Sequence, residues 1–309
     1  MVNAETIGTL YAGHQWQWQP GRMKQGYELC LRVFGEAGLE PNRIVAKAPH
    51  VAEKYRDFMA IRPTLERSDF DQVKYFTIVH LAQGGFTPGY EWGLYWSMIC
   101  DRELMLGAVP CFSANASAIV SCAFRTWAEM CQVRYGYCFH QQMKFGPVYH
   151  CLGVILHVQR DSRHDDLTMN TSWWSGNAVG ASPYLHGLLR DVYPESYLSQ
   201  PYLDARLGRS RTTLKEWIEA DPARRGSLKP YTDILTKWTP PVEKIPQIRE
   251  ELFRAGRVYF WQFFCPPGAN EQPGPFFRPE LSTPWEAPEP IPDIYRADYW
   301  KDKDPSLTY

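Results

Sequence analysis

The chain has 309 residues, of which 44% are hydrophobic and 22% are charged. This composition is typical of a folded globular protein and excludes a disordered chain. The 33 basic and 34 acidic residues give a net charge of −1, which disfavours a nucleic-acid or membrane-surface binder, because such proteins are usually clearly basic. Aromatic residues are the outlier at 15%.

The N-terminal sequence MVNAETIGTL lacks the basic and apolar regions of a secretory signal. No window approaches 18 uninterrupted apolar residues, so we expect a cytoplasmic protein without a membrane span. In a reducing compartment the eight cysteines are expected to be free and mostly buried thiols rather than four disulfides. Cys30, Cys122 and Cys131 fall within helical patterns, where cysteine acts as a small apolar residue.

The first part of the chain predicts strands that are interrupted by two helices. Residues 6–18 predict an aromatic strand, and apolar residues at helical spacing from Met23 to Phe34 predict a helix that ends before Gly38. A short strand is expected at 43–48, and a hairpin is expected from strands at 73–81 and 91–100. The clearest helix covers 115–133, with Asn115 or Ser113 as its N-cap.

Shorter elements follow in the second part. We predict strands at 135–140, 148–158, 231–238 and 257–264, and helices at 184–190 and 212–219, with Thr212 or Thr213 as the cap of the second. Val242, Ile245, Ile248 and Leu252 predict the apolar face of one more helix, which ends at Gly256.

Strands outnumber helices and do not alternate strictly with them, which predicts an α+β fold with a mainly antiparallel sheet and helices packed on one side. The core is expected over 1–265. A helix followed by an aromatic strand occurs twice, which hints at two similar lobes, 1–160 and 161–265. Ten of the 25 prolines lie in the last segment, 266–309, so this segment predicts an extended, acidic tail.

No catalytic or cofactor motif is present. The eight histidines and eight cysteines show no zinc-ligand spacing, so no metal site is predicted. The chain also lacks a G-x-S-x-G elbow and both glycine-rich phosphate motifs, so we expect no nucleotide cofactor. Asp191 and Glu195 could form an acid–base pair, although a turn fixed by Pro194 explains that sequence more simply.

Aromatic and acidic residues are the best candidates for partner binding. Tryptophan and tyrosine dominate interface hot spots, because they bury a large area and keep a polar atom. The candidate partner-binding residues are Trp173, Trp174, Tyr184, Tyr193, Asp165, Asp166, Asp191 and Glu195, with Tyr197 and Tyr202 in the same aromatic set.

Charge is segregated along the second half. Residues 206–257 hold 12 basic and seven acidic residues, a net of +5, whereas 266–309 hold four basic and eight acidic residues, a net of −4. The simplest interpretation is that the tail lies over the basic lobe. The alternative is that the basic patch binds an acidic partner.

Two stretches carry a resemblance to a known group. YAGHQWQWQPGRMKQGYELCLRVFGEAGLEP (Tyr11–Pro41) resembles the start of bacterial polymorphic-toxin immunity proteins, with Arg22, Glu28 and Cys30 in comparable places. LLRDVYPESYLSQPYLDARLG (Leu188–Gly208), followed by TLKEWI, is similar to a segment of uncharacterised bacterial α+β proteins. The overall pattern is similar to type VI secretion immunity proteins, including the TsiT-like partners of restriction-endonuclease-like toxins.

The resemblance implies a cytoplasmic protein without catalytic activity that binds a cognate secreted toxin, expected to be a nuclease. It would offer carboxylates to the toxin's basic surface. The alternative hypothesis is a hydrolase that uses histidine and carboxylate residues near 184–202, and a third is a structural subunit of a larger assembly. The oligomeric state stays open.

Overall fold

The computed structural model describes residues 7–14, 19–54, 56–81, 92–99, 103–108, 115–142, 189–208, 210–258, 276–278 and 283–285. They divide into two compact units. Unit 1 holds 7–142 together with 232–234, and unit 2 holds the other described residues from 189 onward. Both units combine antiparallel strands with helices, which confirms the predicted α+β class.

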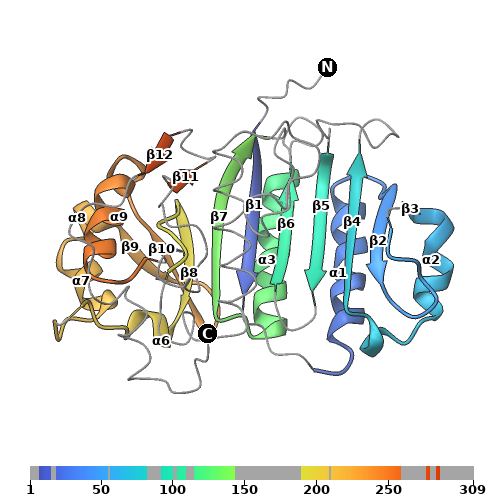
Figure 1. The fold of residues 1–309 in the computed structure, drawn as a ribbon, viewed down its shortest axis with the longest axis horizontal. Coiled ribbons are helices and arrows are strands. Elements are labelled where there is room, and N and C mark those ends of the chain that lie inside the picture. Colours follow the sequence, from blue (N-terminus) through green and yellow to red (C-terminus); the bar gives the residue numbers. More distant parts are fainter. Residues whose placement is uncertain are drawn as a thin grey trace, which may run out of the picture. The chain divides into compact units, whose positions relative to one another are not determined.

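Unit 1 is built on an antiparallel sheet with the strand order β3-β2-β4-β5-β6-β1-β7 (Figure 1). Its strands are β1 (Ile7–His14), β2 (Arg43–Lys47), β3 (Arg56–Asp57), β4 (Tyr75–Leu81), β5 (Trp92–Ile99), β6 (Glu103–Ala108) and β7 (Tyr135–Gln142). The first strand of the chain lies between β6 and β7 and pairs with both. β4 and β5 form the predicted hairpin.

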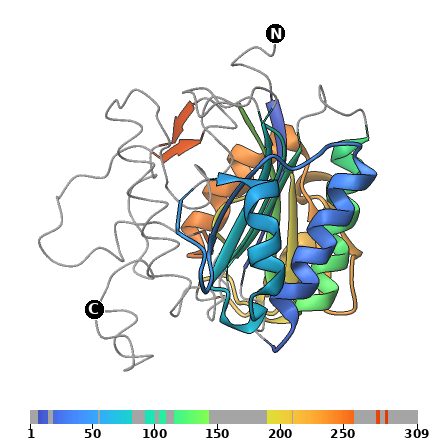
Figure 2. The ribbon, with the colours of Figure 1, turned by 90° about the vertical axis from the view of Figure 1, so that its right-hand side faces the viewer.

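Helices α1 (Arg22–Glu36) and α3 (Ala116–Cys131) lie side by side on one face of this sheet (Figure 2). Helix α3 approaches the sheet closely because two strand residues beneath it, Gly13 and Gly136, have no side chain. A Cβ atom added at Gly13 would lie 2.7 Å from Trp127 Cζ3, and one at Gly136 would lie 2.8 Å from Phe124 Cζ. The two aromatic rings of α3 therefore pack directly on the backbone of β1 and β7.

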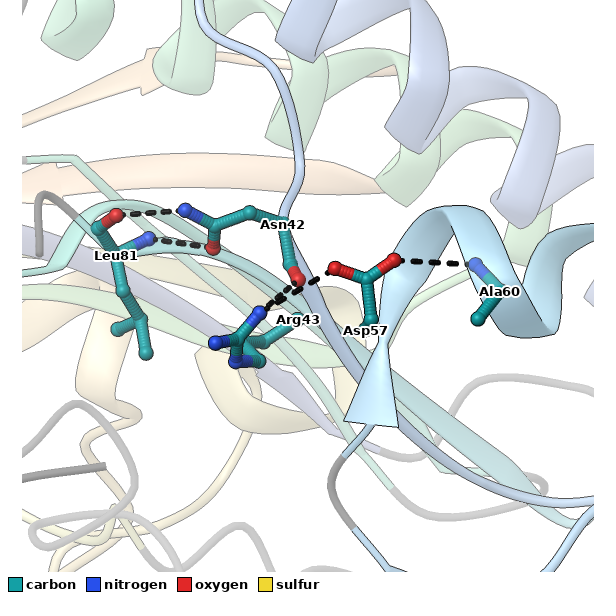
Figure 3. A network of polar contacts seen from close by, with 5 residues as sticks. All are labelled: Asn42, Arg43, Asp57, Ala60 and Leu81. Atoms are coloured by element: carbon teal, nitrogen blue, oxygen red, sulfur yellow. Dashed lines mark hydrogen bonds and ion pairs between the residues drawn. The ribbon is translucent and has the colours of Figure 1, made fainter. Parts of the chain in front are cut away.

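Helix α2 (Phe58–Arg67) borders β2 and β3 at one edge of the sheet, followed by the short helix η1 (Phe70–Gln72). A polar network fixes the start of α2 (Figure 3). The Asn42 side-chain amide donates to the Leu81 carbonyl at 2.7 Å and accepts from the Leu81 N–H at 3.0 Å. Arg43 pairs with Asp57 at 3.5 Å, and Asp57 caps the helix by accepting from the Ala60 N–H.

Unit 2 contains a small antiparallel sheet in which β10 (Leu235–Thr239) pairs with β8 (Glu195–Ser199) on one side and β9 (Ser227–Pro230) on the other. Its helices are α6 (Gln200–Leu203), α7 (Leu214–Ala220), α8 (Pro222–Arg225), η4 (Val242–Lys244) and α9 (Ile245–Arg254). The predicted cap of α7 is confirmed, because Thr213 and Glu216 form a reciprocal capping box. β11 (Phe276–Arg278) and β12 (Thr283–Trp285) form a separate pair.

Several predicted elements need correction. Leu189 forms a parallel bridge with Val258, so the described end of the helix expected at 184–190 is extended. The strand expected at 231–238 begins only at Leu235, because 231–234 form the connection between β9 and β10. Val242 precedes α9 and is 63% exposed, so it does not belong to the apolar face of that helix.

Short elements were also missed. Helix α2, which contains Pro63, and the strands β6 and β9 carry no pattern that predicted them. No regular structure was expected in the tail, where β11 and β12 pair. Asn115 stands at the N-cap of α3 as predicted, but its side chain makes no capping hydrogen bond. The strand expected at 148–158 lies outside the described residues.

The four described cysteines are free thiols, as expected. Cys30, Cys131 and Cys138 are buried, whereas Cys122 lies on the outer side of α3 and is exposed. Among the described helices, none has the length and apolar character that crossing a membrane requires.

Candidate protein-binding surface

Three of the eight predicted partner-binding residues lie in the described part of the chain: Asp191, Tyr193 and Glu195. The other five, Trp173, Trp174, Tyr184, Asp165 and Asp166, lie outside the described residues. The predicted site can therefore be built only from its C-terminal part, in unit 2.

Asp191 belongs to a buried ion pair. Its carboxylate accepts from Arg249 Nε at 2.7 Å and from Arg249 Nη2 at 3.3 Å, and the two side chains are 0% and 2% exposed. The Val192 N–H donates to the same carboxylate at 2.6 Å. Arg249 lies on the buried side of α9, so this contact ties the segment before β8 to that helix.

This burial corrects the expectation for Asp191 and Tyr193. Tyr193 is 0% exposed, like Asp191, and Tyr197 and Tyr202 of the same aromatic set are at most 1% exposed. Their side chains have no surface to offer a partner in this structure. The physical reason is that large aromatic side chains gain most when they are removed from water, and these tyrosines belong to the buried core.

Among the three candidates that the structure describes, Glu195 is the one that reaches the surface, with 28% of its side chain exposed. It accepts from Lys237 Nζ at 2.7 Å and from the Tyr197 hydroxyl at 2.5 Å. Tyr197 lies directly opposite Lys237 in the β8–β10 register. Its ring packs against the half-buried Tyr231 with ring centroids 4.4 Å apart. We call these four residues, Glu195, Tyr197, Tyr231 and Lys237, the Glu195 face.

The Glu195 face does not form the acid–base pair that Asp191 and Glu195 could have made. The Asp191 carboxylate is held by Arg249, and the Glu195 carboxylate is held by Lys237 and Tyr197. Each carboxylate therefore has a basic partner of its own. This arrangement orders the surface and fixes β8 to β10.

A second surface feature lies where α7 meets α8. The Arg225 guanidinium lies 4.3 Å from the centroid of the Trp217 ring, and Arg225 Nη1 donates to the Trp217 carbonyl at 2.7 Å. Both residues are partly exposed. Trp238 Nε1 donates to the Arg225 carbonyl at 2.8 Å, which anchors this corner on the core. Arginine and tryptophan are the residue types most enriched at interface hot spots.

Trp217, Arg225 and Lys237 were not among the residues predicted from the sequence. The TLKEWI segment showed a helix with an aromatic residue, but no local signal places Arg225 over that ring eight residues later. Lys237 gave no local signal either, because its contact with Glu195 spans 42 residues. Only the pairing of β8 with β10 brings the two side chains together.

The histidines and cysteines do not form a site in the described residues. His14 is buried in β1, stacks on Tyr135 and Tyr137, and shares a 3.2 Å hydrogen bond with the Tyr137 hydroxyl. Within the part of the chain that the structure describes, no three His, Cys, Asp or Glu side chains gather as metal ligands would.

Comparison with known proteins gives a likeness of fold. No family model matches the chain, and no curated protein matches it in sequence. Among solved structures, the Pseudomonas aeruginosa T6SS protein PA0821 is similar with a TM-score of 0.52 and 11% sequence identity. The alignment covers 97% of this chain and 86% of that protein. At this identity the likeness shows the fold alone.

Proposed function

We propose that this chain is a cytoplasmic immunity protein of a bacterial type VI secretion system. It binds a cognate secreted toxin, expected to be a nuclease, and neutralises it by tight protein–protein association. The observation that carries the proposal is the likeness of fold to a protein named as a T6SS protein, because it extends over 97% of this chain. The resemblance of Tyr11–Pro41 to the start of immunity proteins points the same way.

The described surface of unit 2 supports binding rather than chemistry. The hydrolase hypothesis needs free carboxylates near 184–202, but Asp191 and Glu195 each pair with a basic side chain. The corner formed by Trp217 and Arg225 instead offers a rigid ring and a guanidinium of the kind that anchors protein interfaces. Its anchoring on Trp238 reduces the entropy lost on binding.

Co-expression tests the proposal directly. The full chain is produced together with the secreted effector encoded next to it, and the mixture is analysed by size-exclusion chromatography and by growth of the producing cells. We expect a stable complex and restored growth. The matched comparison is Trp217→Ala against Trp127→Phe, a conservative change in the core of unit 1: only the first should weaken the complex. An effector that neither co-elutes nor becomes harmless would contradict the proposal.

A further inference from the structure

Two lysines stand directly opposite each other on β9, the edge strand of the small sheet in unit 2, and on its neighbour β10. The register pairs Lys229 of β9 with Lys237 of β10, and Lys237 in turn with Tyr197 of β8. Residues in direct register on antiparallel strands point to the same face, with Cβ atoms roughly 4.5–5.5 Å apart. Like charges at such a position destabilise the sheet. Because Glu195 holds Lys237, the ammonium group of Lys229 is the one that adds repulsion to the sheet without a compensating ion pair among the described residues.

Only one carboxylate of the described residues compensates this pair. Glu195 binds Lys237 at 2.7 Å, whereas Lys229 is exposed and forms no ion pair within the described ranges. At β9, beside the Glu195 face, the ammonium group of Lys229 therefore has no compensating carboxylate among the described residues. Beside it, the half-buried Tyr231 packs against Tyr197 with its ring tilted and supplies an apolar rim.

The edge of β9 does not favour addition of another strand. The Tyr231 N–H donates to the Leu235 carbonyl, so by alternation the pair Lys229–Lys237 is also hydrogen-bonded, and the main chain of Leu228 and Pro230 faces outward. Pro230 has no N–H to donate. A partner would therefore use the side chains of this face rather than extend the sheet.

We propose that Lys229 and Lys237 form an anion-binding pair that receives a carboxylate-bearing segment of the protein partner. The assignment rests on the proposed function and adds the chemistry of the contact. A carboxylate between the two ammonium groups removes their mutual repulsion, and Tyr231 packs against the aliphatic part of the incoming side chain. The sequence predicted that this chain offers carboxylates to a basic partner. At this contact the charges are reversed, because the chain offers ammonium groups and the partner offers the carboxylate.

A peptide titration tests the site without knowledge of the partner. Fluorescently labelled hexaglutamate is titrated with the full chain at low salt, and its anisotropy is compared with that of labelled hexalysine. We expect hexaglutamate alone to bind, and Lys229→Glu to lower its affinity at least about tenfold. The matched control is Lys24→Glu, which makes the same charge change on an exposed position of α1. Equal weakening by both variants, or none by Lys229→Glu, overturns the site.

The stability of the same variant separates a binding role from a structural one. Lys229→Glu replaces a like-charge pair with an opposite-charge pair, so the midpoint of urea unfolding of unit 2 should rise while binding falls. A fall in both would indicate that Lys229 supports the fold, and would overturn the proposal. Neutralising the eight carboxylates of 266–309 should leave the affinity for hexaglutamate unchanged. A gain in affinity would make that segment the occupant and overturn the partner assignment.

The two proposals fail in different ways. If Lys229→Glu abolishes peptide binding but the effector forms no complex, the anion site stands and the immunity function is wrong. If the effector complex forms with wild-type affinity in Lys229→Glu, the function stands and the anion site is not the contact. Loss of the effector complex in Lys229→Glu but not in Lys24→Glu supports both.

Discussion

Replacing Arg249 by methionine should lower the free energy of unfolding of unit 2 more than any single surface substitution does. The substitution removes both hydrogen bonds that Arg249 donates to Asp191, at 2.7 and 3.3 Å, and leaves a carboxylate that is 0% exposed. Loss of one partner from a buried ion pair costs about 3–5 kcal/mol, because the remaining charge stays desolvated. That is a large fraction of the stability of an ordinary domain.

The double variant Asp191→Leu/Arg249→Met separates the charge effect from packing. Apolar residues of similar size often replace a buried ion pair without loss, so we expect the double variant within about 1 kcal/mol of wild type. The control is Arg254→Met on the same helix, whose partner Glu250 is 49% exposed. An exposed pair of this kind contributes about 0.3–0.5 kcal/mol.

Urea unfolding followed by tryptophan fluorescence measures these differences, and hydrogen exchange of peptides from β10 and α9 assigns them to unit 2. The reasoning is refuted if Arg249→Met costs no more than Arg254→Met. It is also refuted if the double variant is as unstable as the single one, because the loss would then come from shape rather than from removing the basic partner of Asp191.

Three further outcomes are expected. Gly226→Ala should destabilise unit 2, because Gly226 has φ of +90° and an added Cβ would lie 2.2 Å from a backbone oxygen of β10; thermal unfolding measures the loss. The pKa of Glu216 is lowered by hydrogen bonds from the Thr213 backbone and hydroxyl, so the cap stabilises α7 above the unfolded pKa of about 4.3 and this contribution disappears as pH falls through the lower folded value. Glu216→Gln should flatten the stability–pH curve in that window. Burial raises the pKa of Cys131 to about 12, so iodoacetamide at pH 8 should modify the exposed Cys122 and spare Cys131 in the native protein, as mass spectrometry would show.

Local periodicity was enough to predict the longest helices, α1 and α3, and several of the strands. The 3.6-residue spacing from Met23 to Phe34 is a property of neighbouring residues, and α1 follows it over Arg22–Glu36. The same holds for α3 and for the Thr213 cap of α7. Helix α2 was not predicted because Pro63 interrupts its pattern. Strand β9 was not predicted because four residues are too few to show a period.

The candidate surface, by contrast, depends on contacts between residues that lie far apart in the sequence, and no local pattern predicts such contacts. Asp191 stood out in the sequence as an exposed acidic candidate, and only the packing of α9 places Arg249 against it across 58 residues. The acidic and aromatic residues near 191–197 were recognised as special, but their partners were not.

Composition and periodicity by themselves determined the α+β class and the positions of the longer helices and strands, because these depend on the hydrogen bonding and burial of adjacent residues. The tertiary structure alone decided that β1 lies between β6 and β7 and that Lys229 faces Lys237. Strand order and register are set by how distant segments share one core, and a shift of one residue would turn each lysine to the opposite face.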